Sequence, residues 1–179
     1  MRITYYSCYS KGYPYIIFLQ NNCKLVAEPD FYCYLKVVLN LYQMLKEGDE
    51  FRHKFSYTQD DVDTYARVSG DTNPLHIDPA AGKASMFGRN IIHGFLGASV
   101  FTKIFGALWY ADGHVYMSQT MKWMKPMFVD TEYEAVITVK ETYPEKNRIL
   151  YDCAVYEVST GDKTIAGEAL LLNKKQYVW

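Results

Sequence analysis

The sequence predicts an α+β fold in which an antiparallel β-sheet wraps around one long central helix. Three observations support this prediction: an almost wholly apolar segment at 91–110, a hydrophobic period of two from residue 114 onward, and turn signals that divide this later region into four segments. An apolar helix of this kind is buried on most sides, and alternating strands have one wet face. A sheet that wraps around the helix satisfies both requirements.

Composition narrows the class of protein. The 179 residues are 49% hydrophobic, enough for one domain that buries roughly two thirds of its unfolded surface. With 19 basic and 20 acidic side chains, the chain has no broad charge that would attract nucleic acid or an anionic membrane. No uninterrupted apolar run approaches the ~20 residues that span a bilayer, and the run at 15–19 is a poor signal peptide. We therefore expect a soluble, cytoplasmic protein with neither nucleic acid nor membrane as a partner.

Cysteine spacing indicates no metal or redox centre. The four residues fit no zinc or redox motif, and the chain is not a small secreted domain. We therefore expect free thiols and no bound metal. The cysteines are Cys8, Cys23, Cys33 and Cys153.

The chain has two compositional zones, 1–43 and 44–179. The first contains eight of the 17 tyrosines and three of the four cysteines, and its hydrophobic pattern keeps neither helical nor strand periodicity for long. The sequence from Met44 reads as the opening of a compact domain. Two hypotheses follow: residues 1–43 lie upstream of the true start at Met44, or they form a short N-terminal extension that packs against the domain.

The first elements of the domain have clear boundaries. Residues 49–58 alternate enough to form a strand, and Thr58 with Asp61 resembles a capping box that opens a helix. Gly70 ends this helix. Asp78 followed by Pro79 starts a second, short helix, with Asp78 as the N-cap. The residues expected on the buried face of the first helix are Val62, Tyr65, Ala66 and Val68.

The central helix and the strands complete the fold. Glycines within 91–110 lower helix propensity but allow close packing against the backbone. In the strand at 131–143, alternate residues from Tyr133 to Val139 are expected on the buried face. Methionines and aromatic residues alternate at 121–128, which indicates a surface against the helix or, alternatively, the lining of an acyl tunnel. The four strands are expected at 114–128, 131–143, 147–159 and 163–173.

The loop "SGDTNPLHID" at 69–78 carries the strongest chemical signal. Pro74 fixes its own φ and disfavours helical backbone at Asn73, whose side-chain amide can brace the turn. Asp71 and His76 can then face one water molecule from opposite sides of a rigid loop. A carboxylate and an imidazole at such a water are suited to general acid–base catalysis.

The start of the central helix supplies the complementary chemistry. At His93–Gly94 the backbone N–H groups have no partner within the helix, and the helix dipole places partial positive charge there. Glycine allows an oxygen to approach without a Cβ in the way. The helix start is therefore a candidate oxyanion hole.

Together these segments resemble the hydratase motif of the MaoC-like family, the hot-dog-fold (R)-specific enoyl-CoA hydratases. The resemblance extends over about residues 46–173. Seven or more fixed positions within 24 residues carry it, which makes it far more specific than a lone glycine motif. These are Asp71, Asn73, Pro74, His76, Asp78, Phe87, Gly88, His93 and Gly94.

The resemblance implies a hot-dog fold, commonly a homodimer or higher homo-oligomer, that adds water to a trans-2-enoyl-CoA or removes it from an (R)-3-hydroxyacyl-CoA. The family's catalytic pair falls on Asp71 and His76, and its thioester-binding amide on Gly94. Thr102 stands where the family often has a hydroxyl near the pair. No cofactor is implied, because CoA is part of the substrate. Two departures are Asn90 in place of proline and Phe95 in place of methionine, which are expected to loosen the turn and to narrow the pocket, respectively.

Each site residue, taken alone, also fits a structural role. Asp71 could cap a turn, His76 could be a hydrogen-bonded core histidine, and Gly94 could be a packing glycine. For His93 we expect a structural role in orienting the loop, and Asn73 and Pro74 support the same loop. Two other functions stay open: a hot-dog acyl-CoA thioesterase and a non-catalytic module that binds acyl-CoA.

Overall fold

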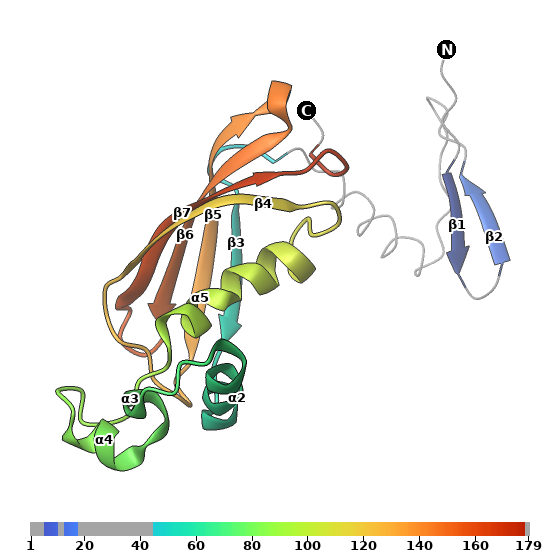
Figure 1. The fold of residues 1–179 in the computed structure, drawn as a ribbon. Coiled ribbons are helices and arrows are strands. Elements are labelled where there is room, and N and C mark those ends of the chain that lie inside the picture. Colours follow the sequence, from blue (N-terminus) through green and yellow to red (C-terminus); the bar gives the residue numbers. More distant parts are fainter. Residues whose placement is uncertain (1–5, 11–12, 18–44, 178–179) are drawn as a thin grey trace. The chain divides into compact units, whose positions relative to one another are not determined.

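A computed structural model describes residues 6–10, 13–17 and 45–177 (Figure 1). The chain divides into two units, residues 1–40 and 41–179. The hypothesis about a start at Met44 lies outside the described residues.

In the first unit, two short strands pair antiparallel, although the hydrophobic pattern of this segment predicted no regular element. They are β1 (Tyr6–Ser10) and β2 (Tyr13–Ile17).

The second unit is built on a five-stranded antiparallel sheet with the order β3-β5-β6-β7-β4. All five strands lie where the sequence predicted them, but β4 ends at Trp123 rather than Phe128. The proline at 126 has no N–H to donate to the ladder, which explains why the chain leaves the sheet here. The strands are β3 (Glu50–Phe55), β4 (Val115–Trp123), β5 (Tyr133–Tyr143), β6 (Arg148–Glu157) and β7 (Lys163–Leu172).

The alternation predicted for β5 is confirmed. Tyr133, Ala135, Ile137 and Val139 are at most 1% exposed and face the core. On the opposite face, Glu134 pairs with Arg52 of β3, so this side of the sheet is wet and charged. The sheet therefore has one buried face and one solvated face, as its period of two requires.

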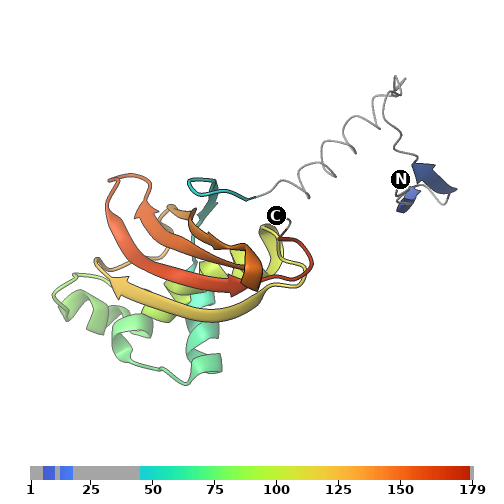
Figure 2. The same cartoon turned by 90° about the horizontal axis from the view of Figure 1, so that it is seen from above.

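The central helix α5 (Gly94–Lys103) lies across the buried face, and the strands curve around it (Figures 1 and 2). It continues as a π-helix, η1 (Ile104–Leu108), which the sequence predicted as ordinary helix. Leu96, Val100 and Phe101 of α5 pack into the core. One side of the helix stays exposed in the single subunit, so the predicted burial on most sides holds only for the side that faces the sheet. No helix in the described part of the chain is long and apolar enough to cross a bilayer.

Three short helices gather where α5 begins (Figure 1). They are α2 (Gln59–Ser69), α3 (Pro74–Ile77) and α4 (Pro79–Ala84). The capping box of α2 is confirmed: Thr58 Oγ1 accepts from the Asp61 N–H at 3.3 Å, and Asp61 Oδ2 accepts from the Thr58 N–H at 2.8 Å. The predicted cap of α4 is also present, because Asp78 Oδ1 accepts from the Ala80 N–H.

The buried face of α2 is narrower than predicted. Val62 and Ala66, one helical turn apart, are buried, and Gly70 ends the helix with a φ of 78°. Val68 is 82% exposed, so its predicted burial was wrong. An eleven-residue helix at the end of a domain buries one narrow stripe, and Val68 lies off that stripe.

Cys153 is a buried free thiol in the core, in agreement with the expectation for this residue. Burial raises the pKa of its thiol, which makes it a poor nucleophile. Cys23 and Cys33 lie outside the described residues.

Candidate active site

The loop after α2 is held by two side-chain to backbone hydrogen bonds. Asp71 Oδ1 accepts from the Asn73 N–H at 3.3 Å, and Asn73 Oδ1 accepts from the Leu75 N–H at 3.0 Å. Asn73 is the N-cap of α3, and Pro74 is its first residue. One oxygen of Asp71 thus braces the turn, as the structural interpretation expected, and the other oxygen is left for a second role.

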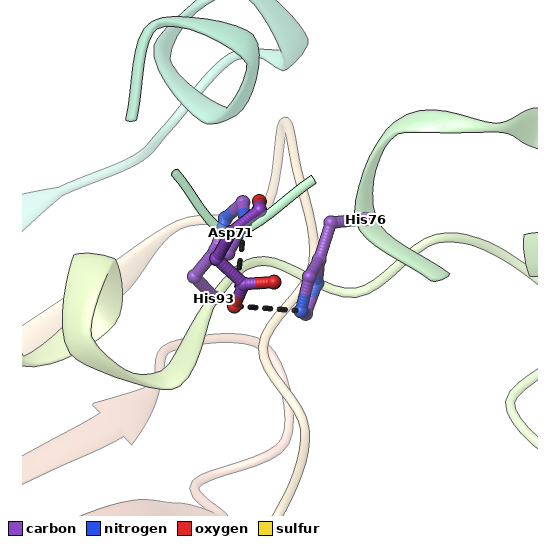
Figure 3. A group of neighbouring side chains, drawn as sticks. All are labelled: Asp71, His76 and His93. Carbon is purple, nitrogen blue, oxygen red and sulfur yellow. Dashed lines mark hydrogen bonds and ion pairs between the residues drawn. The ribbon is translucent and has the colours of Figure 1, made fainter. Parts of the chain in front are cut away.

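That second oxygen faces His76. Asp71 Oδ2 lies 4.0 Å from His76 Nε2, in an arrangement where the carboxylate is 54% exposed and the imidazole 11% exposed (Figure 3). His76 Nδ1 is 2.7 Å from the Ile91 carbonyl oxygen. Because a carbonyl can only accept, Nδ1 carries a proton, and in the neutral ring Nε2 then presents a lone pair to the carboxylate. Two acceptors at this distance do not bond each other, but one water molecule can donate to both.

His93 supports this pair from the buried side. It is 2% exposed, and its Nε2 donates to the backbone carbonyl of Asp71 at 2.9 Å. Its ring lies against the His76 ring with centroids 3.9 Å apart, and against Tyr65 at 5.0 Å. Its Nδ1 is buried and has no hydrogen-bond partner in the described part of the chain. In this position His93 holds the backbone of Asp71 and the plane of His76.

The three side chains also form the geometry of a possible metal site. Ligand atoms of Asp71, His76 and His93 lie within 4.8 Å of one another. With its proton on Nε2, which donates to the Asp71 carbonyl, a neutral His93 could bind an ion only through Nδ1, the buried nitrogen of its ring. Asp71 Oδ2 and His76 Nε2 face each other as they stand, and this arrangement suits proton transfer to and from a water molecule.

Gly94 is the first residue of α5, so its N–H has no acceptor within the helix. On its other side, the indole Nε1 of Trp123 donates to the Gly94 carbonyl at 2.9 Å. A Cβ at position 94 would lie 2.7 Å from this nitrogen, closer than van der Waals contact permits. Glycine is thus required for packing against Trp123 as well as for open access to the N–H.

A pocket of about 300 Å³ joins the two halves of the motif. His76 and His93 line it together with Gly94, and so do residues 123–127, which comprise the end of β4 and the segment after it. A hydrogen bond from the Ile92 N–H to the Met127 carbonyl ties the two lining segments together. Asp71 lies beside the pocket, at its ion-pair distance from His76. The alternating methionines and aromatics at 121–128 thus include residues that line this pocket. The interpretation of this segment as the lining of an acyl tunnel stays a prediction.

Trp123 is a site residue that the sequence analysis did not name. The signal was present in the alternation at 121–128, but the pattern alone does not show which side chain reaches the start of α5. The contact with Gly94 spans 29 residues of sequence. Asn90 was named only as a departure expected to loosen the turn: its amide is hydrogen-bonded to the loop, so this expectation was wrong.

Two other expectations are not met in the subunit. Thr102 is exposed and lies about 12 Å along α5 from Gly94, so the structure does not bring it to the pair. Phe95, which we expected to narrow the pocket, is 61% exposed, and its ring packs edge-on against Trp123 outside the pocket lining.

Comparison with known proteins identifies the family of the chain. Residues 42–160 match the family model described as "MaoC like domain". An (R)-specific enoyl-CoA hydratase from Aeromonas caviae is 30% identical over 129 residues, which cover 72% of this chain and 96% of that enzyme. A mitochondrial 3-hydroxyacyl-[acyl-carrier-protein] dehydratase from Arabidopsis thaliana is 32% identical over 107 residues, which cover 60% of this chain and 63% of that enzyme.

Solved structures show the same fold. The (R)-hydratase of A. caviae superposes with a TM-score of 0.70 at 30% identity, covering 73% of this chain and 98% of that one. An R-hydratase from Pseudomonas aeruginosa, in the unliganded form, gives a TM-score of 0.68 at 27% identity, covering 72% of this chain and 82% of that one.

Proposed function

The chain belongs to the MaoC-like domain family and has the hot-dog fold of its R-hydratases, and from this premise we propose that it catalyses the reversible hydration of trans-2-enoyl-CoA to (R)-3-hydroxyacyl-CoA. Its relatives in the comparison are hydro-lyases. One observation supports the proposal most directly. Asp71 and His76 face each other across 4.0 Å, beside a pocket whose wall includes the start of α5.

In the proposed reaction, one water molecule donates to Asp71 Oδ2 and to His76 Nε2. One of the two lone pairs on its oxygen can then attack C3 of the enoyl thioester. The group that accepts the proton from water becomes the acid that protonates C2, so the OH and the H of one water are added. Because both proton carriers lie on one side of the substrate, we expect syn addition. Positioned acid–base groups of this kind typically contribute ~10²–10⁴-fold to the rate.

The negative charge that develops on the thioester oxygen requires a donor. Our candidate donor is the N–H of Gly94, the first residue of α5, and the dipole of this helix contributes about half a positive charge at the same end. One such donor typically stabilises the transition state by about 2.7–4 kcal/mol. The reaction as proposed needs no cofactor or metal, since CoA is part of the substrate.

We also propose a homodimer. In the described sheet, β4 is an edge strand with exposed apolar side chains, Val115 and Met117 among them, and α5 exposes Phe95 on the same subunit. Exposed apolar edges of this length are usually covered, because they otherwise promote aggregation. A second copy would cover both. The proposed location of the protein is the cytoplasm, on the grounds of composition alone.

The proposal is tested by following the loss of enoyl absorbance from crotonyl-CoA, with chiral analysis of the product. Release of free CoA without hydration would instead indicate an acyl-CoA thioesterase. Binding without turnover, across a range of acyl chain lengths, would indicate a non-catalytic acyl-CoA-binding module.

The roles of the pair are tested with Asp71→Asn and His76→Ala, each of which should lower turnover by ~10²-fold or more because it removes a proton carrier. Asp152→Asn is the matched control. Asp152 is a sheet carboxylate with a side-chain exposure of 55%, close to the 54% of Asp71, and it lies on the solvated face. Near-normal turnover in either site variant would contradict the assignment.

A further inference from the structure

The amide of Asn90 is the centre of a hydrogen-bond cluster next to the pocket. Its Nδ2 lies 2.8 Å from the Leu75 carbonyl oxygen, 2.9 Å from that of Asp78 and 3.3 Å from that of Pro74. Carbonyl oxygens only accept, so the side chain must point its NH₂ group at all three. One side chain therefore ties together the first and last carbonyls of the turn that carries His76.

The helix α4 provides the space for this side chain. A Cβ at Gly82 would lie 2.5 Å from the backbone nitrogen of Asn90 and 2.7 Å from its Cγ. Gly82 is buried, and its φ is not in the left-handed region, so close packing rather than backbone conformation requires glycine here. The missing side chain at Gly82 thus leaves the space that Asn90 occupies.

The next residue connects Asn90 to the catalytic imidazole. The Ile91 carbonyl accepts from His76 Nδ1 at 2.7 Å, while the Ile91 N–H makes only a long contact, 3.4 Å, with the Leu75 carbonyl. The two short hydrogen bonds of Asn90 thus hold segment 90–91 against α3. The carbonyl that selects the tautomer of His76 is placed by this attachment.

We propose that Asn90 is a positioning residue that acts through His76. By binding the carbonyls of Leu75 and Asp78, it holds the Ile91 carbonyl where it keeps the proton on Nδ1 and directs Nε2 toward Asp71. This inference rests on the proposed hydratase function.

The test uses Asn90→Ala, which removes the amide, and Asn90→Asp, which keeps its size but replaces the donors with a carboxylate that faces three carbonyl oxygens. We expect kcat for crotonyl-CoA hydration to fall by roughly 10- to 100-fold in both, with KM little changed, because the substrate contacts remain while a reacting group is misplaced. Nitrogen NMR of the His76 ring in the free protein should show one tautomer in the natural chain and a mixture in both variants.

Two further variants separate positioning from general loss of stability. Asn173→Ala is the matched control: its Nδ2 also bridges two carbonyls, of Tyr110 and Asp112, each at 3.0 Å, but beyond the far end of α5. It should lower the melting temperature without changing kcat or the His76 signals. Gly82→Ala, which displaces Asn90 without replacing it, should reproduce the loss of the Asn90 variants.

The outcomes are distinct. Unchanged His76 tautomers in folded Asn90 variants, or a loss of kcat no greater than that of Asn173→Ala, would overturn the inference. If Asn90→Ala does not fold, Asn90→Asp and Gly82→Ala provide the same comparison. If the natural chain hydrates no enoyl-CoA, the proposed function fails, but the tautomer measurement still decides whether Asn90 positions His76.

Discussion

Substitution of Gly94 by alanine tests the helix start most sharply. The new Cβ would lie 2.7 Å from Nε1 of Trp123 and 3.1 Å from two of its ring carbons. Ordinary contact begins near 3.4 Å, so the indole or the start of α5 must move by about 0.7 Å. The indole and Gly94 both line the pocket, so this displacement reaches the proposed oxyanion donor directly.

The expected magnitude follows from two contributions. Loss of the 2.9 Å hydrogen bond between Trp123 and the Gly94 carbonyl should lower stability by about 1 kcal/mol, which a folded domain tolerates. A misplaced oxyanion donor raises the barrier by about 2.7–4 kcal/mol, which corresponds to a fall in kcat of ~10²–10³-fold. The variant should therefore stay folded and lose most of its turnover.

The assay is hydration of crotonyl-CoA, with kcat and KM measured separately and thermal unfolding as the check on folding. Gly106→Ala is the matched control, because it lies in η1 of the same helical segment and a Cβ there meets no atom within 4 Å. It should leave kcat unchanged and should not destabilise the protein. A Gly94→Ala enzyme that keeps near-normal kcat would refute the reasoning, since neither the contact with Trp123 nor the placement of the amide would then matter to the reaction.

Two predictions concern stability. Burial lowers the pKa of His114, and the hydrogen bond to the Phe105 carbonyl opposes this shift only in part. As the pH falls, the unfolded chain therefore binds a proton at this residue before the folded chain does. The stability of the fold should then decrease below about pH 6.5. Between pH ~7.5 and ~5.5, the melting temperature of His114→Gln should fall less than that of the natural chain. An equal fall in both proteins would show that other groups cause the loss of stability. Thr58→Ala removes half of the capping box of α2 and should lower the free energy of unfolding in urea by about 0.5–2 kcal/mol while leaving kcat unchanged. No loss of stability would mean that solvent satisfies this helix start equally well.

Short-range features were predictable because the groups that make them lie within a few residues of each other. The capping box of Thr58 and Asp61 spans three residues, and the turn at Asn73 and Pro74 is braced by a side chain that bonds the backbone two residues on. The alternation from Tyr133 to Val139 follows from the geometry of a strand with one buried face. In each case the local chain contains both partners, so the sequence is sufficient.

The resemblance to the MaoC-like family went further and indicated Asp71, His76 and Gly94 as one site. Their types and spacing predicted acid–base chemistry beside a helix start, and in the structure His76 and Gly94 line one pocket while Asp71 faces His76 beside it. Asp71 and Gly94 also have structural roles. Asp71 braces its turn with one oxygen, and Gly94 makes room for Trp123.

Other features depended on how distant segments meet. His93 bonds the carbonyl of Asp71 across 22 residues, and Trp123 bonds that of Gly94 across 29. Val68 has a residue type suited to the core, yet no segment within the described residues covers its side of α2. The tautomer of His76 depends on the Ile91 carbonyl, whose position is set by Asn90. Residue type and spacing were enough to indicate the chemical groups and the local turns. Which nitrogen carries the proton and which side chains hold it there depended on packing between segments, because a hydrogen bond of this kind exists only once both parts of the chain are in place.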